Sequence, residues 1–360
     1  MKIIFNRYPY LSYYVETEDN YILKLYRIPA GKNQTINLNE KNNKKVVLLQ
    51  HGIMDSSDAF IVNYENKSLP FLLANLGYDV WLGNNRGNKY SRNHTILDPK
   101  VNKNEFWEFS LHEMGKYDLP AMIKFIQENT KSTNNEIKKI TYVGHSQGTA
   151  QLFAGLTLLP DFYQSSLNGF IALGPVTSLK NLSSTLLKFM EKFNLPDFLA
   201  YLGFHEIFPD IEFVSNFQQL VCSKFGIICS GILETISDYS TKDDDMDRFV
   251  VYVSHFPSGS SLNCFLHFVQ LMRYQPFSSF REMIPYDLTK IKNIPIALFV
   301  GSDDRLATPE DNRILKKTLE QQNVLNFYRE YENTGHISFF VSKSNIFMND
   351  VLQKIKEFSK

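Results

Sequence analysis

The amino-acid sequence predicts an α/β fold, in which a mostly parallel central sheet carries an inserted, mainly helical segment. Short runs that are apolar throughout alternate with stretches of helical character, which is typical of a parallel sheet buried on both faces. That alternation stops between about residues 177 and 284. We therefore expect a core built from residues 1–176 and 285–360, with residues 177–284 inserted as a helical cap or lid.

The expected elements follow one another in a regular order. Residues 11–28 alternate in the manner of a hairpin, with a turn at Glu18-Asp19-Asn20. Apolar runs then predict buried strands at Val46–Gln50, Tyr78–Leu82, Ile140–Val143, Phe170–Leu173 and Ile296–Val300, and a further strand-like run at Val324–Glu330. Helices are expected near residues 66–76, 113–129, 147–158, 310–321 and 346–358.

The composition excludes several classes of partner. The 360 residues include 38 Lys and Arg against 38 Asp and Glu, so no long-range attraction toward nucleic acid is expected. No apolar run approaches about 18 residues, so we expect no transmembrane helix. The first residues lack the apolar stretch of about 7–15 residues that a signal peptide needs, which indicates either a cytoplasmic protein or a processed or truncated form.

The inserted segment is rich in phenylalanine and holds 14 of the 29 phenylalanines of the chain. This enrichment is consistent with an apolar-lined cover over a site, or with a small helical subdomain that fills its own core. The three cysteines also leave two possibilities open, because either Cys222 and Cys229 form a disulfide or these two and Cys264 are buried thiols. No C-x-x-C motif or histidine pair at ligand spacing is present, so we expect no metal site.

One pentapeptide carries the strongest chemical signal. Gly144-His145-Ser146-Gln147-Gly148 has the pattern G-x-S-x-G and lies between a strand-like run and the start of an expected helix. A serine on such a turn adopts a strained backbone conformation that exposes its hydroxyl, and a Cβ on either glycine would collide with a neighbouring element. The alternative is a chance match in a loop, but the strand–turn–helix context favours Ser146 as a nucleophile.

A serine nucleophile needs a base to take its proton and an acid to orient that base. With this type of turn the chain order is Ser, then Asp or Glu, then His. Asp303 and Asp304 directly follow an expected strand, at the end where the sites of open α/β sheets gather, and position alone does not choose between them. His336 is the only histidine that follows them in the sequence, so chain order selects it as the base.

Two backbone N–H groups are expected to stabilise the oxyanion. One is that of Gln147, which follows the serine at a helix start, and the other usually comes from the loop after an early strand. Gly52 ends such a strand and lets the backbone turn toward the site, so the Ile53 N–H is the second candidate. His51 precedes the serine in the chain, so we interpret it as structural.

Longer motifs resemble one family, the acid lipases of the gastric lipase and lysosomal acid lipase group. The resemblance extends along nearly the whole chain, and the segments that carry it most specifically are Thr17–Leu23, Leu49–Gly52, Gly77–Asn88, Glu113–Pro120, Gly144–Thr149 and Tyr252–Ser261. It implies an α/β-hydrolase core with a helical cap and a lid, and hydrolysis of triacylglycerols and sterol esters without a cofactor. It also implies an apolar lipid ester as partner, at a lipid–water interface, and a lysosomal or secreted location.

The resemblance also assigns roles to residues. The acid of the family maps onto Asp304, the base onto His336, and the oxyanion donors onto Ile53 and Gln147. A cap disulfide of the family maps onto Cys222 and Cys229, although the loop between them is shorter here. The chain departs from the family pattern beside the acid, where Asp303 and Arg305 stand in place of a lysine and an apolar residue.

Two other classes of function share these features. An acyltransferase or thioesterase would use the same triad with a different acceptor or acyl donor. A non-enzymatic lipid-binding protein on the same scaffold would normally have lost members of the triad, whereas this chain keeps all of them. We therefore expect a serine hydrolase that acts on the ester bonds of apolar lipids.

Overall fold

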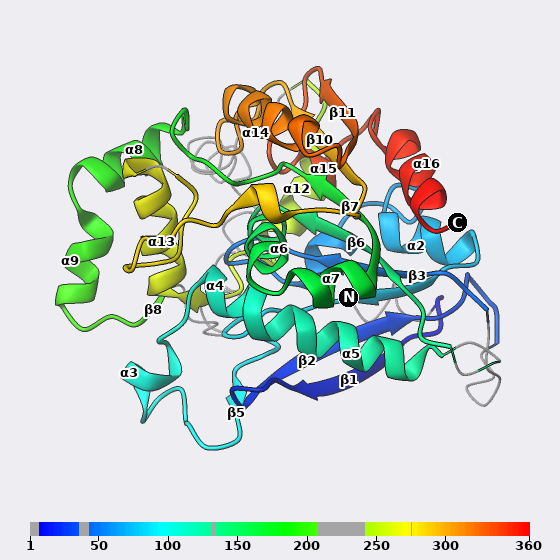
Figure 1. Cartoon of the computed structure of the whole chain (residues 1–360), viewed down its shortest axis with the longest axis horizontal. Helices are drawn as coiled ribbons and strands as arrows, with labels where there is room; N and C mark the ends of the chain where they lie inside the picture. The colour runs from blue at the N-terminus through cyan, green and yellow to red at the C-terminus, as the bar shows by residue number, and fades with distance from the viewer. Residues whose placement is uncertain (1–6, 36–42, 132–133, 135, 208–241, 275) are drawn as a thin grey trace.

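One sheet organises the part of the chain that this computed structural model describes, residues 7–35, 43–131, 134, 136–207, 242–274 and 276–360. Its nine strands are β1 (Leu11–Glu16), β2 (Tyr21–Ile28), β3 (Val46–Gln50), β4 (Asp79–Leu82), β5 (Asn93–His94), β6 (Ile140–His145), β7 (Leu167–Leu173), β10 (Ile296–Gly301) and β11 (Leu325–Tyr331). They lie in the order β1-β2-β4-β3-β6-β7-β10-β11, with β5 beside β2 (Figure 1). β2 pairs antiparallel with β1, β4 and β5, and the pairs from β4 to β11 are parallel. The predicted α/β fold with a mostly parallel sheet is confirmed.

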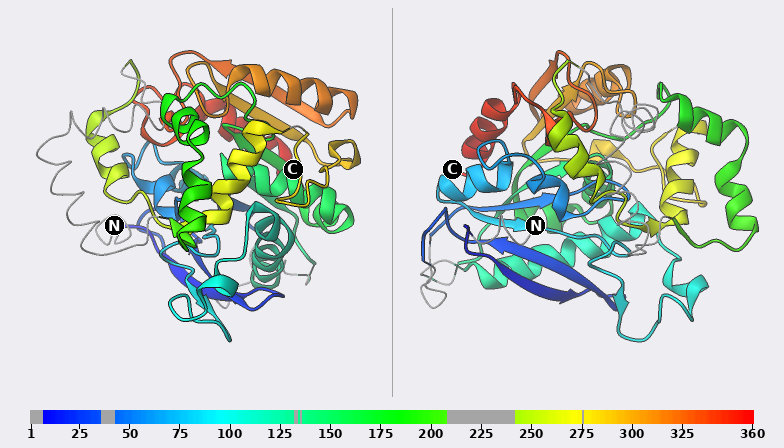
Figure 2. Two further views of the ribbon diagram at one scale, coloured as in Figure 1. Left: turned by 90° about the vertical axis from the view of Figure 1, so that its left-hand side faces the viewer. Right: turned by 180° about the vertical axis from the view of Figure 1, so that it is seen from behind.

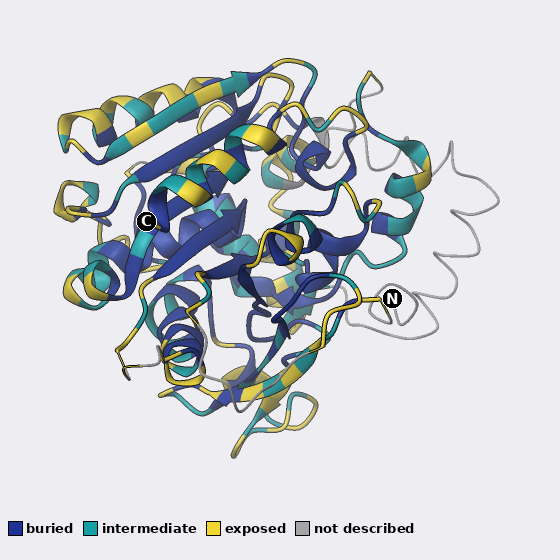
Figure 3. Cartoon of the chain, turned by 90° about the vertical axis from the view of Figure 1, so that its right-hand side faces the viewer, coloured by how far each residue is buried: buried dark blue, intermediate teal, exposed yellow. Residues whose placement is uncertain are grey.

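Helices cover both faces of this sheet. On one face lie α5 (Leu119–Asn129), α6 (Gln147–Leu158), α7 (Pro160–Ser166) and α14 (Pro309–Gln321), and on the other lie α2 (Leu69–Asn75) and α16 (Met348–Phe358). Successive residues of one strand enter opposite cores, since Leu48 packs on the first side and Val47 and Leu49 on the second. Figure 3 shows the buried strands between helices whose outer faces are exposed. Burial on both sides explains why the strands are apolar throughout.

Short helical segments complete the core. They are η1 (Ser57–Ile61), α3 (Lys103–Phe106), α4 (Leu111–Glu113), η2 (Met114–Asp118), η3 (Leu288–Lys290) and α15 (Ser338–Val341). The helix expected near residues 113–129 is therefore not one regular helix, because the π-helical turn η2 separates α4 from α5. Pro120 has no N–H to donate to the carbonyl group of residue 116 and clashes with it, so the regular α-helical ladder is interrupted here.

Residues 177–284 are mainly helical where they are described. They contribute α8 (Thr185–Lys192), α9 (Leu195–Tyr201), β8 (Glu206–Ile207), α12 (Met246–Val253), β9 (Ser260–Ser261) and α13 (Leu262–Arg273). α8, α9 and α13 form a group to one side of the sheet, at the left of Figure 1 and at the right of the second view in Figure 2. α12 instead packs against α15 of the core. The helical character is as expected, and the division into a core and a separate cap stays a prediction.

All three cysteines of the chain lie in the inserted segment. Cys222 and Cys229, for which a disulfide and two buried thiols were both left open, lie outside the described residues. Cys264 is a buried free thiol on α13. None of the helices that the structure describes is long and apolar enough to cross a membrane.

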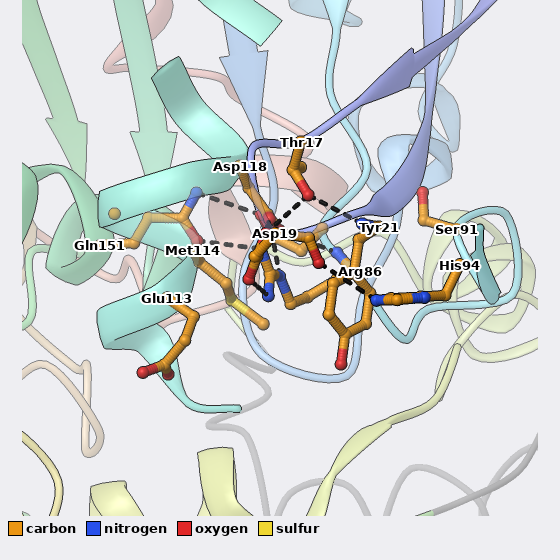
Figure 4. Close-up of polar contacts among 12 residues, drawn as sticks. Thr17, Asp19, Tyr21, Arg86, Ser91, His94, Glu113, Met114, Asp118 and Gln151 are labelled. Atoms are coloured by element: carbon orange, nitrogen blue, oxygen red, sulfur yellow. Dashed lines mark hydrogen bonds and ion pairs between the residues drawn. The ribbon is translucent and has the colours of Figure 1, made fainter. Parts of the chain in front are cut away.

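A buried arginine links the β1–β2 hairpin to the helices of the core (Figure 4). Arg86 Nε donates to Asp118 Oδ1 at 2.7 Å, and the two terminal nitrogens donate to Asp19 at 2.6 and 2.8 Å. The guanidinium group also lies 4.0 Å from the centre of the Tyr21 ring. Burial opposes its charge, but the Asp118 and Asp19 carboxylates raise the pKa of Arg86 above its ordinary value. Three of the long motifs that carry the family resemblance therefore meet in one ion cluster.

Candidate active site

Ser146 lies on the sharp turn between β6 and α6. Its backbone has φ 54° and ψ −119°, a strained conformation for a residue with a side chain. A Cβ on Gly144 would lie 2.7 Å from the carbonyl oxygen of Gly148, and a Cβ on Gly148 would lie 2.5 Å from that of Gln50. The two glycines are therefore needed because β3, β6 and α6 approach too closely for any side chain there. The Ser146 N–H donates to the Leu173 carbonyl at 3.1 Å, which joins the turn to β7.

Asp304 and His336 meet beyond the carboxyl ends of β10 and β11. His336 Nδ1 lies 2.8 Å from Asp304 Oδ2, and both side chains are buried. A carboxylate oxygen only accepts hydrogen bonds, so Nδ1 carries the hydrogen and Nε2 is the basic nitrogen. The other oxygen of Asp304 accepts from the backbone N–H groups of Leu306 and Ala307 at 2.9 and 2.7 Å. Hydrogen bonds to both carboxylate oxygens thus fix the position of Asp304.

Asp303 occupies a different environment from its neighbour. Its side chain is exposed, and its carboxylate accepts a hydrogen bond from the Ser302 hydroxyl at 2.8 Å. Position in the sequence did not choose between the two aspartates, whereas the family resemblance selected Asp304, and the geometry pairs Asp304 with His336.

One residue expected to supply an oxyanion donor directly follows Ser146, and the other lines the same cavity. Gln147 is the first residue of α6, so its N–H has no acceptor within the helix. Its side-chain Nε2 donates to Met114 Sδ at 3.2 Å. Ile53 lines the same cavity as Ser146.

His51 occupies a buried structural position, as its place in the chain predicted. Its Nε2 accepts from the backbone N–H of Asn85 at 3.1 Å, so its Nδ1 is the donor to the Gly52 carbonyl oxygen at 2.8 Å. Burial lowers the pKa of His51 to about 4 and keeps the ring neutral. The Gly52 carbonyl and the Ile53 N–H belong to one peptide group, so His51 orients the expected donor.

A mostly apolar cavity opens beside Ser146 and His336. Many of the side chains that line it come from residues 177–284, among them Leu179, Leu182, Leu187, Phe265, Phe268 and Met272. One carboxyl group also lines it, that of Asp55, which accepts from the Tyr252 hydroxyl at 3.1 Å. Burial raises the pKa of Asp55 to about 7. Within the described ranges, no three His, Cys, Asp or Glu side chains are grouped so that they could hold a metal ion.

The cavity supports one explanation of the phenylalanine enrichment, an apolar-lined cover over a site. Phe256, Phe265 and Phe268 line the cavity beside the serine. Phe249 and Phe277 are instead buried in the hydrophobic cores. The enrichment therefore has more than one physical origin.

Two residues near the site were not singled out by sequence reasoning. Gly174 has φ +53°, and a Cβ on it would lie 3.2 Å from the His336 ring and 3.4 Å from Asp304 Oδ2. His145 lies with its ring centre 4.7 Å from that of His336. The only available signals were that Gly174 directly follows an expected strand and that His145 precedes the serine.

Comparisons with known proteins identify the family. A family model described as alpha/beta hydrolase fold matches residues 45–343, and one described as a partial alpha/beta-hydrolase lipase region matches residues 3–64. The gastric triacylglycerol lipase of Rattus norvegicus is 38% identical over 350 residues, which are 92% of this chain and 84% of the relative. The chain belongs to the acid lipase family of α/β-hydrolases. The resemblance found in the motifs is confirmed.

Other relatives agree with membership of the acid lipase family. The lysosomal acid lipase/cholesteryl ester hydrolase of Homo sapiens is 36% identical over 349 residues, covering 92% of this chain and 83% of the relative. A solved structure of a thermophilic esterase from Thermogutta terrifontis matches with a TM-score of 0.53 and 15% identity, over 97% of this chain and 100% of that one. At that identity the likeness concerns the fold alone. As a member of this lipase family, the protein is an ester-hydrolysing enzyme.

Proposed function

We propose that this acid lipase hydrolyses apolar lipid esters through an acyl-enzyme formed on Ser146. The relatives carry the names gastric triacylglycerol lipase and lysosomal acid lipase/cholesteryl ester hydrolase, so triacylglycerols and sterol esters are the proposed substrates. The observation that carries the proposal is the 2.8 Å contact between Asp304 and His336, with His336 and Ser146 lining the same cavity.

The proposed reaction has two halves. In the first, His336 takes the proton of Ser146 as the serine oxygen attacks the ester carbonyl, and Asp304 holds the imidazole in the tautomer that this step needs. The N–H groups of Ile53 and Gln147 stabilise the oxyanion, each by about 3–4 kcal/mol in the transition state. His336 then protonates the leaving alcohol, and water cleaves the acyl-enzyme with His336 again as base.

We further propose that residues 177–284 form the cap that binds the acyl chain. Their apolar side chains line the cavity next to Ser146, and α8, α9 and α13 stand to one side of the sheet. An apolar cavity with few polar groups suits an acyl chain, which offers no hydrogen-bond donors.

A lipid–water interface is the partner that we propose for the outer surface of α8, α9 and the residues after them. Large apolar side chains are exposed there within a short stretch of chain: Phe189, Phe193, Phe198, Tyr201, Leu202 and Phe204. An exposed apolar patch of this kind is typical of a surface that meets a membrane or another apolar partner.

The test is the variant Ser146→Ala, compared with Ser165→Ala, whose serine is exposed on α7. The wild-type protein should hydrolyse a short p-nitrophenyl ester and emulsified triolein or cholesteryl oleate across pH 4–8. Ser146→Ala should lose about 10⁶-fold in kcat and no longer react with a fluorophosphonate probe, while Ser165→Ala stays close to wild type. Retained turnover in Ser146→Ala would sink the assignment, and activity confined to the soluble ester would contradict the lipid interface.

A further inference from the structure

His145 is the residue before the proposed nucleophile. One of its ring nitrogens is hydrogen-bonded, and the other has no hydrogen-bond partner among the described residues. Its Nε2 lies 2.9 Å from the backbone carbonyl oxygen of His336. A carbonyl oxygen only accepts, so Nε2 carries the hydrogen and Nδ1 of the neutral ring is a hydrogen-bond acceptor. The residue is only 3% exposed, and Nδ1 has no hydrogen-bond partner among the residues that the structure describes. A buried acceptor in this state is unfavourable unless a ligand satisfies it.

The unpartnered nitrogen lies close to the proposed nucleophile. His145 lines the same cavity as Ser146 and His336. A Cβ built on Gly52 would lie 3.4 Å from His145 Nδ1 and 3.5 Å from Ser146 Oγ, so both atoms border the same small space beside the oxyanion loop. The acceptor is therefore next to the oxygen on which the acyl-enzyme would form.

The surroundings keep this acceptor neutral and in place. Burial lowers the pKa of His145 well below its ordinary value, and the neighbouring His336 and His51 lower it further. The ring is packed by Phe340, whose ring centre lies 4.5 Å away, and the ring centre of Phe339 lies 6.1 Å away. His145 therefore stays an acceptor even when the solution is acidic enough to protonate an ordinary histidine.

The chemistry of the cycle limits which donor can reach that nitrogen. This step rests on the proposed function, in which the substrate is an apolar lipid ester. The ester groups of triacylglycerols and sterol esters accept hydrogen bonds and donate none. The donors that take part are water, which has two hydrogens on its oxygen, and alcohols, which have one.

We propose that His145 is a further catalytic residue, whose Nδ1 binds one hydrogen of the water that cleaves the acyl-enzyme. The water oxygen bonds to the acyl carbonyl carbon and gives its other proton to His336 Nε2. That proton then passes to Ser146 Oγ as the bond between the carbonyl carbon and Oγ breaks. The water hydrogen that is hydrogen-bonded to His145 Nδ1 stays covalently attached to the water oxygen. It becomes the hydroxyl hydrogen of the fatty acid, so all atoms are accounted for.

This arrangement favours water over alcohols as the acceptor of the acyl group. An alcohol gives its single hydrogen to His336 and has none for His145. With an alcohol as acceptor, the His145 nitrogen is therefore left without a hydrogen bond. His145 thus favours hydrolysis of the acyl-enzyme over its transfer to an alcohol.

The experiment measures how the acyl-enzyme divides between water and methanol. The full-length protein is supplied with p-nitrophenyl butyrate and methanol, and butyric acid and methyl butyrate are both quantified. Their ratio depends only on the step after acylation. In His145→Phe and His145→Leu the ratio of methyl ester to acid should rise about 10-fold, and acyl-enzyme should accumulate in intact-mass spectra.

A matched control is Phe340→Leu, which loosens the packing around the His145 ring but keeps Nδ1. In this variant both products should slow together, with their ratio unchanged. An unchanged ratio in the His145 variant that folds would overturn the inference, as would a ratio that rises equally in Phe340→Leu. A wild-type protein that forms neither product would instead refute the proposed function, so the two failures are distinguishable.

Discussion

Two buried polar clusters in this protein differ in how completely their hydrogen bonds are satisfied. In the Arg86 cluster, Nε and both terminal nitrogens of the guanidinium group contact a carboxylate of Asp118 or Asp19. In the site cluster, Asp304 orients His336 through Nδ1, and His145 has one nitrogen with no partner among the described residues. The first cluster is built to hold segments together, whereas the second keeps a basic atom and an acceptor at the edge of a cavity.

The number of satisfied hydrogen bonds distinguishes structural from catalytic polar groups in the same core. A buried charge whose donors are all paired is strongly destabilised when one partner is removed, because the other is left uncompensated. A buried imidazole whose second nitrogen lines a cavity can transfer a proton to or from a reactant, or form a hydrogen bond with it. Substitutions in the first cluster should therefore change stability, and substitutions in the second should change rate.

The largest effect is expected for Asp304→Asn. The amide no longer holds His336 in the required tautomer, so kcat for a p-nitrophenyl ester should fall about 10⁴-fold while the fold is kept. Asp303→Asn is the matched control, because its side chain is exposed and accepts a hydrogen bond from Ser302, and its kcat should stay near wild type. Equal losses in the two variants would mean that the observed Asp304–His336 contact has no catalytic role.

A smaller effect, on stability, is expected for Arg86→Met. Removing the guanidinium group leaves the buried Asp118 carboxyl without its cationic partner, so the free energy of unfolding should fall by about 3–5 kcal/mol. The control is Arg313→Met, which breaks the exposed ion pair with Glu330 and should change stability by less than about 1 kcal/mol. Urea denaturation gives both values, and kcat per folded molecule should be unaffected in each. A lower kcat in Arg86→Met at full folding would erase the distinction between the clusters.

The strands and helices could be predicted well because their signals are local. Val46–Gln50 is apolar throughout since both of its faces are buried, and the sequence displays that directly. The helix expected at 147–158 has those bounds in the structure for the same reason. The turn η2 departs from expectation because Pro120 interrupts a periodic pattern that otherwise continues through it.

The candidate site could be predicted from the chain order of its residues and from their positions after strands. Ser146, Asp304 and His336 each follow a strand of the parallel part of the sheet, so the topology alone brings them to one edge. Chain order does not separate Asp304 from Asp303, so only the family resemblance selected Asp304 before the structure paired it with His336. Arg86 lies 67 residues from Asp19, and such a pairing has no local signature.

The smallest predicted effect concerns Gly174, where a substitution should change both the stability and the rate. At φ +53° an alanine is strained, so Gly174→Ala should lower the free energy of unfolding by about 1–2 kcal/mol. The new Cβ would also lie 3.2 Å from the His336 ring, so the ring must shift by a few tenths of an ångström. Because proton transfer depends on the position of that ring, kcat should fall about 10-fold in addition.

Gly77→Ala separates the two effects, because Gly77 has φ +87° and a Cβ on it would meet nothing within 4 Å. Its alanine variant should show a similar loss of stability, measured by urea denaturation, with kcat per folded molecule unchanged. If both variants lose rate equally, the loss in Gly174→Ala comes from general destabilisation. If only Gly174→Ala loses rate, this glycine belongs to the site, because the ring of the proposed base leaves no room for a side chain beside it.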